Sequence, residues 1–370
     1  MRVKKALQGH PESPRLWASL IDGIIKALGF LPCHHEPCVY TKVDNGDVIY
    51  FLRQVDDFAV SAKTKVIAET IIENINSKLS IQIKSLGVIN RFNGVDIAQT
   101  RDYIKIYNKT YISKILKSKN WLEATIPKND CIAYTPMHHD LTFNKNIETA
   151  DPIPAKELPT IEKEMGFSYK QGIGELIYAM VTCRPDISYP IIKLSQYSTK
   201  PSRIHFEAVR SIYQYLKNTI NEGIHYWRNK PRPDCPPSPK PIPLTDYTNY
   251  EPDDCKTTLD PRKMDIQVDA SYANDTGHRK SVTGIIARLA GGTILYKTKF
   301  QDIVALSSTE AEFIAACDVG KNSLYIRSIL EDMQLPQDEA TIIYEDNQGA
   351  IAMANASYPT KRTKHIDTRI

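Results

Sequence analysis

The chain has 370 residues, of which 42% are hydrophobic and 24% are charged, and its formal net charge is +4. This length predicts two or three domains with ample material for buried cores. No apolar run approaches the length of a membrane span, and the basic start leads into Gln8 and Gly9 instead of a signal-peptide core. Seven cysteines, an odd number, do not suggest a disulfide framework. An intracellular protein without a membrane partner is expected, and the net charge alone does not indicate nucleic-acid binding.

The first predicted helix begins near Ser13, with Ser13 as its N-cap and Pro14 at its first position. Its apolar stripe is expected to face a core: Trp17, Leu20, Ile21, Ile24 and Leu28.

Two apolar strands joined at Asp56-Asp57 are predicted over residues 47–62. An aspartate pair alone more often marks only a turn, because aspartate makes local hydrogen bonds there. At a hairpin tip, however, two carboxylates stay hydrated and ionised, which suits metal binding.

The segment Cys33-His34-His35-Glu36-Pro37-Cys38 raises the alternative of a zinc site. It lacks a second pair of ligands, so an ordinary entry into a strand is favoured.

Helical stripes alternate with proline stops over residues 165–228. Asp186, in RPDISY (184–189), is expected to be structural and to cap a helix. The tyrosines among lysines in this stretch have two possible roles. They could stack on nucleic-acid bases, but on amphipathic helices tyrosines more often pack at the edge of a hydrophobic core. Residues 229–263 are rich in proline and then in acidic residues, which predicts a semi-rigid linker, with an SH3-type ligand as the less favoured alternative.

Three acidic residues near the C-terminus each begin or end a predicted element. Asp269 lies in the alternating strand of residues 265–272, Glu312 opens a helix, and Asp346 closes the apolar strand of residues 341–345. A strand, helix, strand order can bring three carboxylates around a divalent metal. Mg²⁺ prefers such oxygen ligands, and a pair of ions activates water and stabilises the leaving oxygen of a phosphodiester. The pattern predicts a site for nucleic-acid cleavage.

Two of these carboxylates also have a simpler interpretation. Thr309 and Glu312 fit a capping box in which Glu312 bonds back to the helix start, and Asp346 is well placed to cap the short helix after it. Taken singly, each residue favours capping, because caps are far commoner than metal sites. The choice depends on the surrounding sequence.

Five ordered motifs contain or flank these acids: DASYA (269–273), RKSVTG (279–284), VALSSTEAEF (304–313), EDNQGAIA (345–352) and RTKHID (362–367). They closely resemble the ribonuclease H domain of copia-type LTR retrotransposon polyproteins. The resemblance implies that Asp269, Glu312 and Asp346 match three of the family's four metal-binding acids, with Asp269 bridging two ions. The fourth acid is expected on a later helix, beyond Ile370, and Asp367 is not expected to replace it.

A second set of motifs lies in the first part of the chain: ALQGHPESP (6–14), LGF (28–30), EPCVY (36–40), the Asp56-Asp57 hairpin, LG (86–87), FNGVDI (92–97) and YI (111–112). These resemble the palm, and the region from primer grip to thumb, of a copia-type reverse transcriptase. The resemblance implies that Gln8 and Gly9 border the incoming nucleotide and that Asp56 and Asp57 hold metal.

Two departures from that family matter. Gln54 stands where most members have the tyrosine of Tyr-x-Asp-Asp, which removes an aromatic ring beside the primer end. The family's first polymerase aspartate lies on a strand upstream of this sequence, so the two-metal polymerase site is expected to be incomplete. Polymerase activity of this chain by itself is not expected.

The expected fold class is α/β and α+β multidomain. Its expected parts are a partial reverse-transcriptase palm (1–100), a thumb-like segment (101–150), a helical connection (165–228), the linker (229–263) and an RNase H-like mixed sheet with flanking helices (264–370).

By resemblance, the expected function is that of a retrotransposon reverse transcriptase and RNase H with Mg²⁺ or Mn²⁺ as cofactor. The alternative is a catalytically inactive remnant or a nucleic-acid-binding module. Expected partners are an RNA–DNA hybrid, an RNA template with a DNA primer, and other parts of the polyprotein, such as integrase, or an oligomeric partner. The expected location is a cytoplasmic virus-like particle or the nucleus.

Overall fold

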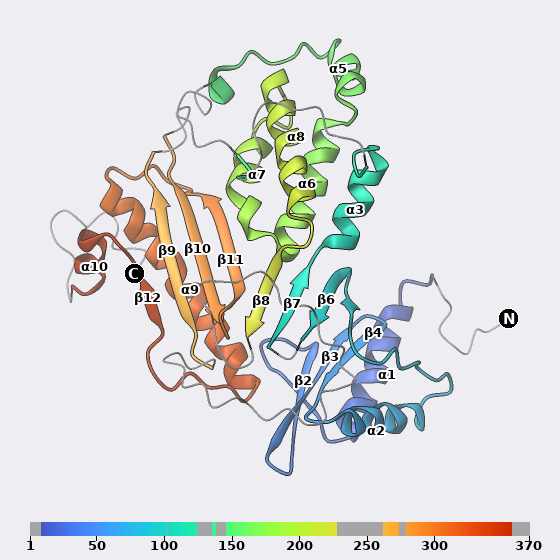
Figure 1. Ribbon diagram of the computed structural model, residues 1–370. Coiled ribbons are helices and arrows are strands. Elements are labelled where there is room, and N and C mark those ends of the chain that lie inside the picture. Colours follow the sequence, from blue (N-terminus) through green and yellow to red (C-terminus); the bar gives the residue numbers. More distant parts are fainter. Residues whose placement is uncertain are drawn as a thin grey trace. The chain divides into compact units, whose positions relative to one another are not determined.

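The computed structural model describes residues 9–100, 102–123, 135–137, 146–227, 262–273 and 279–356. Within them lie three four-stranded sheets and their helices, so the expected mixture of helices and sheets is confirmed (Figure 1). The chain divides into two compact units, residues 1–93 with 322–340, and residues 94–321 with 341–370. None of the described helices combines the length and hydrophobicity needed to cross a bilayer.

The first unit contains an antiparallel sheet and two helices that cover one of its faces (Figure 1). In spatial order the strands are β1 (Leu31–Pro32), β2 (Val39–Asp44), β3 (Asp47–Gln54) and β4 (Asp57–Ser61), and the helices are α1 (Ser13–Ala27) and α2 (Lys65–Asn76). Ile49 and Phe51 alternate along β3 and are buried against both helices, which holds the layers together.

The start and the buried face of α1 differ in detail from the prediction. Glu12, not Ser13, is the N-cap residue, and it makes no side-chain capping bond. Ile21 and Ile24 are buried as expected, but Leu20 is 51% exposed whereas Ile25 is fully buried. The buried stripe is therefore rotated away from Leu20 toward Ile25, because the position of the sheet decides which side of the helix is covered.

A bundle of helices forms a second core, in the other unit. The helices are α3 (Lys109–Ser118), α5 (Leu158–Met165), α6 (Tyr169–Cys183), α7 (Ser188–Ser195) and α8 (Arg203–Asn218), with a short 3₁₀ helix at Pro185–Ile187. A second sheet has the order β5 (Arg91–Phe92), β6 (Val95–Gln99), β7 (Tyr103–Tyr107) and β8 (Gly223–Trp227). Asp96 of β6 accepts hydrogen bonds from the Thr110 backbone and hydroxyl, both at 2.7 Å, which ties this sheet to the first turn of α3.

The structural role expected for Asp186 takes a different form from a helix cap. Its carboxylate accepts bonds from Arg184 Nε and Nη2 and from the Tyr215 hydroxyl. Arg184 is 1% exposed and also donates to Thr219 on the C-terminal side of α8. Asp186 therefore neutralises a buried guanidinium, and this pair fastens the link between α6 and α7 to α8.

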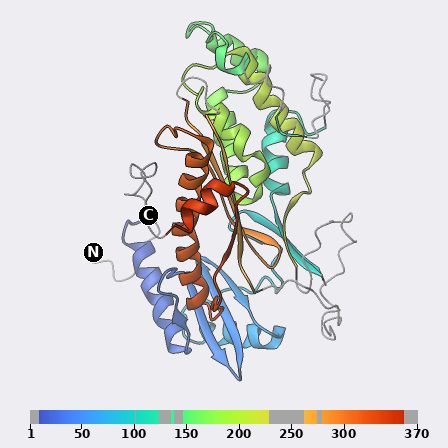
Figure 2. The same cartoon turned by 90° about the vertical axis from the view of Figure 1, so that its left-hand side faces the viewer.

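The third sheet is mixed and lies in the second unit. In spatial order its strands are β11 (Gly292–Phe300), β10 (Val282–Leu289), β9 (Asp265–Ser271) and β12 (Ile342–Tyr344), with β12 parallel to β9 and the other pairs antiparallel. The connection from β11 to β12 contains α9 (Ser308–Asp332), and α10 (Gln348–Ala354) follows β12. Figure 2 shows α10 lying against α9, where Phe313 and Ala350 are buried together.

The four elements expected around the acidic residues, two strands and two helices, are therefore all present. The expected linker falls outside the described residues except for Arg262 and Lys263.

Candidate metal centre

Two of the three carboxylates are brought together by the pairing of β12 with β9. These strands are parallel, and Tyr344 is level with Gln267. Asp346 follows Tyr344 by two residues, and Asp269 follows Gln267 by two. Because the C-terminal ends of parallel neighbours lie at the same edge of a sheet, Asp269 and Asp346 become adjacent.

Glu312 comes to the same place from the first turns of α9. One carboxylate oxygen from each of Asp269, Glu312 and Asp346 lies within 4.8 Å of the other two. The expected convergence is thus observed, and Asp269 lies on an inner strand of the sheet. No other group of three or more potential ligands of this kind occurs among the described residues.

The helix cap expected from Glu312 is made by another residue. Ser307 Oγ accepts a hydrogen bond from the Glu310 backbone at 3.1 Å, and Glu310 Oε2 accepts one from the Leu306 backbone at 2.8 Å. The capping-box interpretation of Glu312 is therefore wrong, because Glu310 is the residue three positions after the cap. Glu312 faces the other acids.

The expected cap from Asp346 is also wrong. The N-cap of α10 is Asn347, whose Oδ1 accepts a bond from the Ala350 backbone at 3.0 Å. Asp346 is exposed and belongs to the carboxylate group. Neither of the two simpler roles thus competes with a metal site.

Glu312 is the buried member of the group, with 6% of its surface exposed. Its Oε2 atom is buried without a hydrogen-bond partner among the described residues. Burial raises the pKa of Glu312 to about 7, and repulsion from Glu345, Asp269 and Asp346 adds to this, while a bond with the Ala270 backbone opposes it. A buried carboxylate with an unpaired oxygen, surrounded by acids, requires a proton or a cation.

The donor set fits a hard divalent cation. Three carboxylates from three elements supply oxygen ligands, and the exposure of Asp269 and Asp346 leaves room for water or phosphate. Asp269, Glu312 and Asp346 are the residues that would hold Mg²⁺ or Mn²⁺.

Metal-free protein is expected to lose stability as the pH rises from about 4.5 to about 7. Over this range the folded state keeps a proton on Glu312 that the unfolded state releases, so the free energy of unfolding falls with pH. The full penalty, about 3 kcal/mol, is present above pH 7. Glu312→Gln removes the titrating group and should be the more stable protein at pH 8, with little difference at pH 4.5.

Native-state hydrogen exchange of β9 amides, in EDTA at pH 5 and pH 8, measures this difference. Saturating Mn²⁺ should stabilise the wild-type protein at pH 8 more than it stabilises the variant. Equal pH dependence of the two proteins would contradict the assignment.

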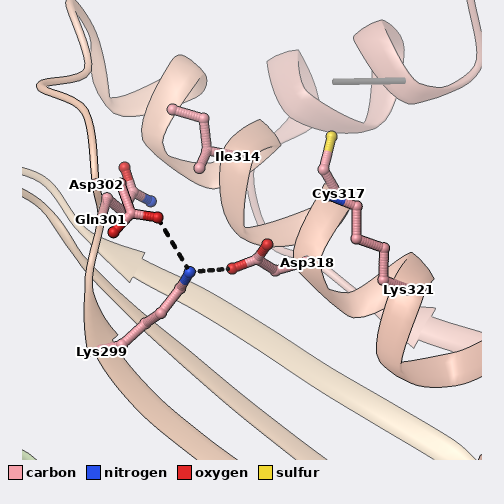
Figure 3. Close-up of a pocket in the computed structure, with 7 residues that line it drawn as sticks. All are labelled: Lys299, Gln301, Asp302, Ile314, Cys317, Asp318 and Lys321. Carbon is pink, nitrogen blue, oxygen red and sulfur yellow. Dashed lines mark ion pairs between the residues drawn. The ribbon is translucent and has the colours of Figure 1, made fainter. Parts of the chain in front are cut away.

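A buried amide fixes the start of α9 against the sheet. Gln301, 1% exposed, donates from Nε2 to Thr283 Oγ1 at 3.0 Å and to the Ala311 carbonyl at 2.8 Å. Ala311 directly precedes Glu312, so this bond holds the backbone that carries the buried carboxylate. Further along α9, Lys299 of β11 pairs with Asp318 at 2.9 Å and with Asp302 at 3.7 Å, beside a cavity of about 240 Å³ (Figure 3).

Two residues near the carboxylates were not singled out from the sequence. The sequence pattern predicts Glu345 only as the end of a strand, yet its charge acts on Glu312. Gln301 directly follows β11, and no pattern in the sequence marks it as a buried amide. The one available signal was the position of Glu345 directly before Asp346, which in an extended segment leaves two acids near one strand end.

The predicted hairpin at the polymerase-like aspartates is observed, with its two-residue turn at Val55–Asp56 and with Asp57 in β4 opposite Gln54. Asp56 and Asp57 are exposed. Val55 has φ +54°, which is strained for a β-branched residue. The Trp17 indole donates to the Val55 carbonyl at 3.1 Å and so holds the turn against α1.

The first unit contains further residues singled out in the sequence. Gly9 is exposed with φ +87°, and Gln8 lies outside the described residues. In the histidine and cysteine segment, His35 binds Asp332 through its backbone and its Nδ1 atom, and the Cys33 thiol is buried. His35 and Asp332, which are distant in sequence, thus form a structural contact within the first unit.

Comparison with known proteins agrees with the motifs. Residues 1–137 match the family described as reverse transcriptase (RNA-dependent DNA polymerase). The whole chain is 31% identical to the retrovirus-related Pol polyprotein from transposon TNT 1-94 of Nicotiana tabacum, covering 24% of that protein. It is 24% identical, over 99% of its length, to the corresponding protein from transposon RE1 of Arabidopsis thaliana, covering 21% of it.

A putative transposon Ty5-1 protein of Saccharomyces cerevisiae is 26% identical over 84% of the chain and 86% of its own length. No solved structure shows significant similarity. The first part of the chain is therefore a reverse transcriptase domain. The chain belongs to the Pol polyproteins of copia-type retrotransposons, and it spans less than a quarter of the length of the two Pol polyproteins.

Proposed function

We propose that residues 264–370 are an RNase H-like domain that hydrolyses the RNA strand of an RNA–DNA hybrid with two divalent metal ions. The observation that carries the proposal is the meeting of Asp269, Glu312 and Asp346, with ligand oxygens within 4.8 Å of one another, from a strand, a helix and a strand end. The five motifs contain or flank these acids, and the mixed sheet with its flanking helices agrees with the expected architecture.

The roles of the residues follow from their positions. Bound ions would supply an activated water and would stabilise the leaving oxygen of the phosphodiester. Asp269, on the inner strand β9 that pairs with β12, is the bridging candidate. Glu312 provides the buried negative charge, and Gln301 holds the backbone beside it. Asp346 is exposed at the strand end, where substrate phosphate can approach. Preference for RNA would come from contacts to 2′-hydroxyls.

A labelled hybrid tests the proposed cleavage. With the label on RNA, we expect slow hydrolysis that is faster with Mn²⁺ than with Mg²⁺, because Mg²⁺ demands near-ideal octahedral geometry and three carboxylates shared by two ions fix that geometry only loosely. With the label on DNA, no product is expected. A folded, hybrid-binding chain that cuts with neither ion would favour the alternative, a catalytically inactive remnant that binds nucleic acid.

Primer extension is not expected from this chain, although its first part belongs to the reverse transcriptase family. Asp56 and Asp57 belong to no group of three potential metal ligands among the described residues, so the pair lacks the third carboxylate of a two-metal site. Purified chain with primed RNA template, deoxynucleotides and Mg²⁺ or Mn²⁺ should give no extension above background. Extension that is lost in Asp56→Asn but not in Asp47→Asn would contradict this expectation.

Gln8 and Gly9 would border an incoming nucleotide in the intact polymerase, and the partners would be an RNA template with a DNA primer, the hybrid, and other parts of the polyprotein such as integrase. The protein would act inside the cell, in a virus-like particle or the nucleus. Support for these assignments comes from the family relationship alone.

A further inference from the structure

A fourth carboxylate, that of Glu345, is anchored directly beside the metal centre. It lies between the end of β12 and Asp346, and its Oε1 atom accepts a hydrogen bond from the Asn347 backbone at 2.9 Å. Asn347 in turn caps α10. The Glu345 side chain is therefore held by the same turn that places Asp346, between the end of β12 and the N-terminus of α10.

The other oxygen of this carboxylate has no partner. Glu345 Oε2 is buried without a hydrogen bond among the described residues, as is Glu312 Oε2. Buried carboxylate oxygens are normally satisfied, because an unpaired one loses its hydration without compensation. Each of these two oxygens therefore lacks a compensating hydrogen-bond donor or positive charge.

Glu345 and Glu312 are also electrostatic neighbours. Among the charged groups that act on Glu312, Glu345 has the largest effect, ahead of Asp269 and Asp346. No lysine or arginine is among the groups that act strongly on either Glu312 or Glu345. Among the described residues, no cationic side chain bonds to either unpaired oxygen, and a cation from solution would supply the missing positive charge.

We infer that Glu345 is a fourth metal-binding carboxylate, which together with Glu312 holds a second divalent cation beside the ion of the Asp269, Glu312 and Asp346 group. This inference rests on the proposed function, since it assigns a ligand for the second of its two ions. Glu312 would then contact both ions, in addition to the bridging Asp269, and its unpaired oxygen would be a ligand of the second ion.

The experiment is a titration of the full metal-free chain with Mn²⁺, read by calorimetry and by the electron paramagnetic resonance signal of free Mn²⁺. Wild-type protein should bind two ions. Glu345→Gln, which keeps the shape and the acceptor for the Asn347 backbone, should keep the first ion and bind the second at least about 10-fold more weakly. Glu331→Gln, which removes an exposed carboxylate from α9, should bind like the wild type.

Each outcome decides one question. If Glu345→Gln bound two ions with the same affinities as the wild type, the role of Glu345 would be overturned. The same conclusion would follow if the wild type bound only one ion and Asp269→Asn did not bind it. No ion bound by folded wild type would overturn the proposed function itself. Glu345→Asp gives a second test, because its shorter side chain should weaken binding of the second ion. An unchanged melting temperature in EDTA would confirm that this variant is folded.

Discussion

Asp269→Asn should lower the rate of RNA-strand hydrolysis by at least about 100-fold, the upper end of losses measured for outer-shell partners of metals. Asn keeps the size of the side chain and one oxygen, but it removes the charge that would bridge two ions. Glu312 and Asp346 would then be the only two carboxylates left in the group of three, so the metal ions would have one anionic ligand fewer. The effect is expected on the turnover of bound hybrid, because the substitution removes a metal ligand.

The matched control is Asp265→Asn. Asp265 lies on the same strand and the same side as Asp269, four residues earlier, but it pairs with Arg288 outside the carboxylate group. Loss of a partly exposed ion pair costs less than about 1 kcal/mol, so cleavage by this variant should be within about twofold of wild type. Equal loss of activity in both variants would point to damage of β9 and not to a metal ligand.

Arg184→Met should lower the free energy of unfolding of the helical bundle by about 3 kcal/mol, the lower end for breaking a buried ion pair. The guanidinium is 1% exposed and donates to Asp186 and to both the carbonyl and hydroxyl oxygens of Thr219. Methionine fills much of the same space but leaves these acceptors unpaired. The lower end is chosen because the Asp186 side chain is 35% exposed and regains water.

Arg203→Met provides the control in the same bundle. Arg203 makes two bonds of 2.8 Å to Glu164, but both side chains are more than half exposed. Such surface pairs contribute less than about 1 kcal/mol. Urea unfolding followed by tryptophan fluorescence should therefore separate the two variants clearly. Equal midpoints would show that the Arg184 network does not stabilise the bundle.

Sequence alone was sufficient to predict several of the elements and the convergence of Asp269, Glu312 and Asp346. Alternation along residues 265–272, the β3–β4 hairpin and the helices after Ser307 and Asn347 are local patterns, and the structure contains all of them. The motifs around Asp269, Glu312 and Asp346 also indicated the retrotransposon family, which comparison over the whole chain confirms. Such features depend on residues close together in sequence, which is why pattern and spacing reveal them.

Which residue of a local group takes which role was decided only by the tertiary structure. Glu310 and Asn347 make the caps that local patterns assigned to Glu312 and Asp346, because the direction in which the chain enters each helix selects the capping side chain. Packing likewise buries Ile25 in place of Leu20. Burial of Glu312 and the nearness of Glu345 arise from contacts between α9, β9 and β12 that are distant in sequence, so the raised pKa of Glu312 is a property of the fold.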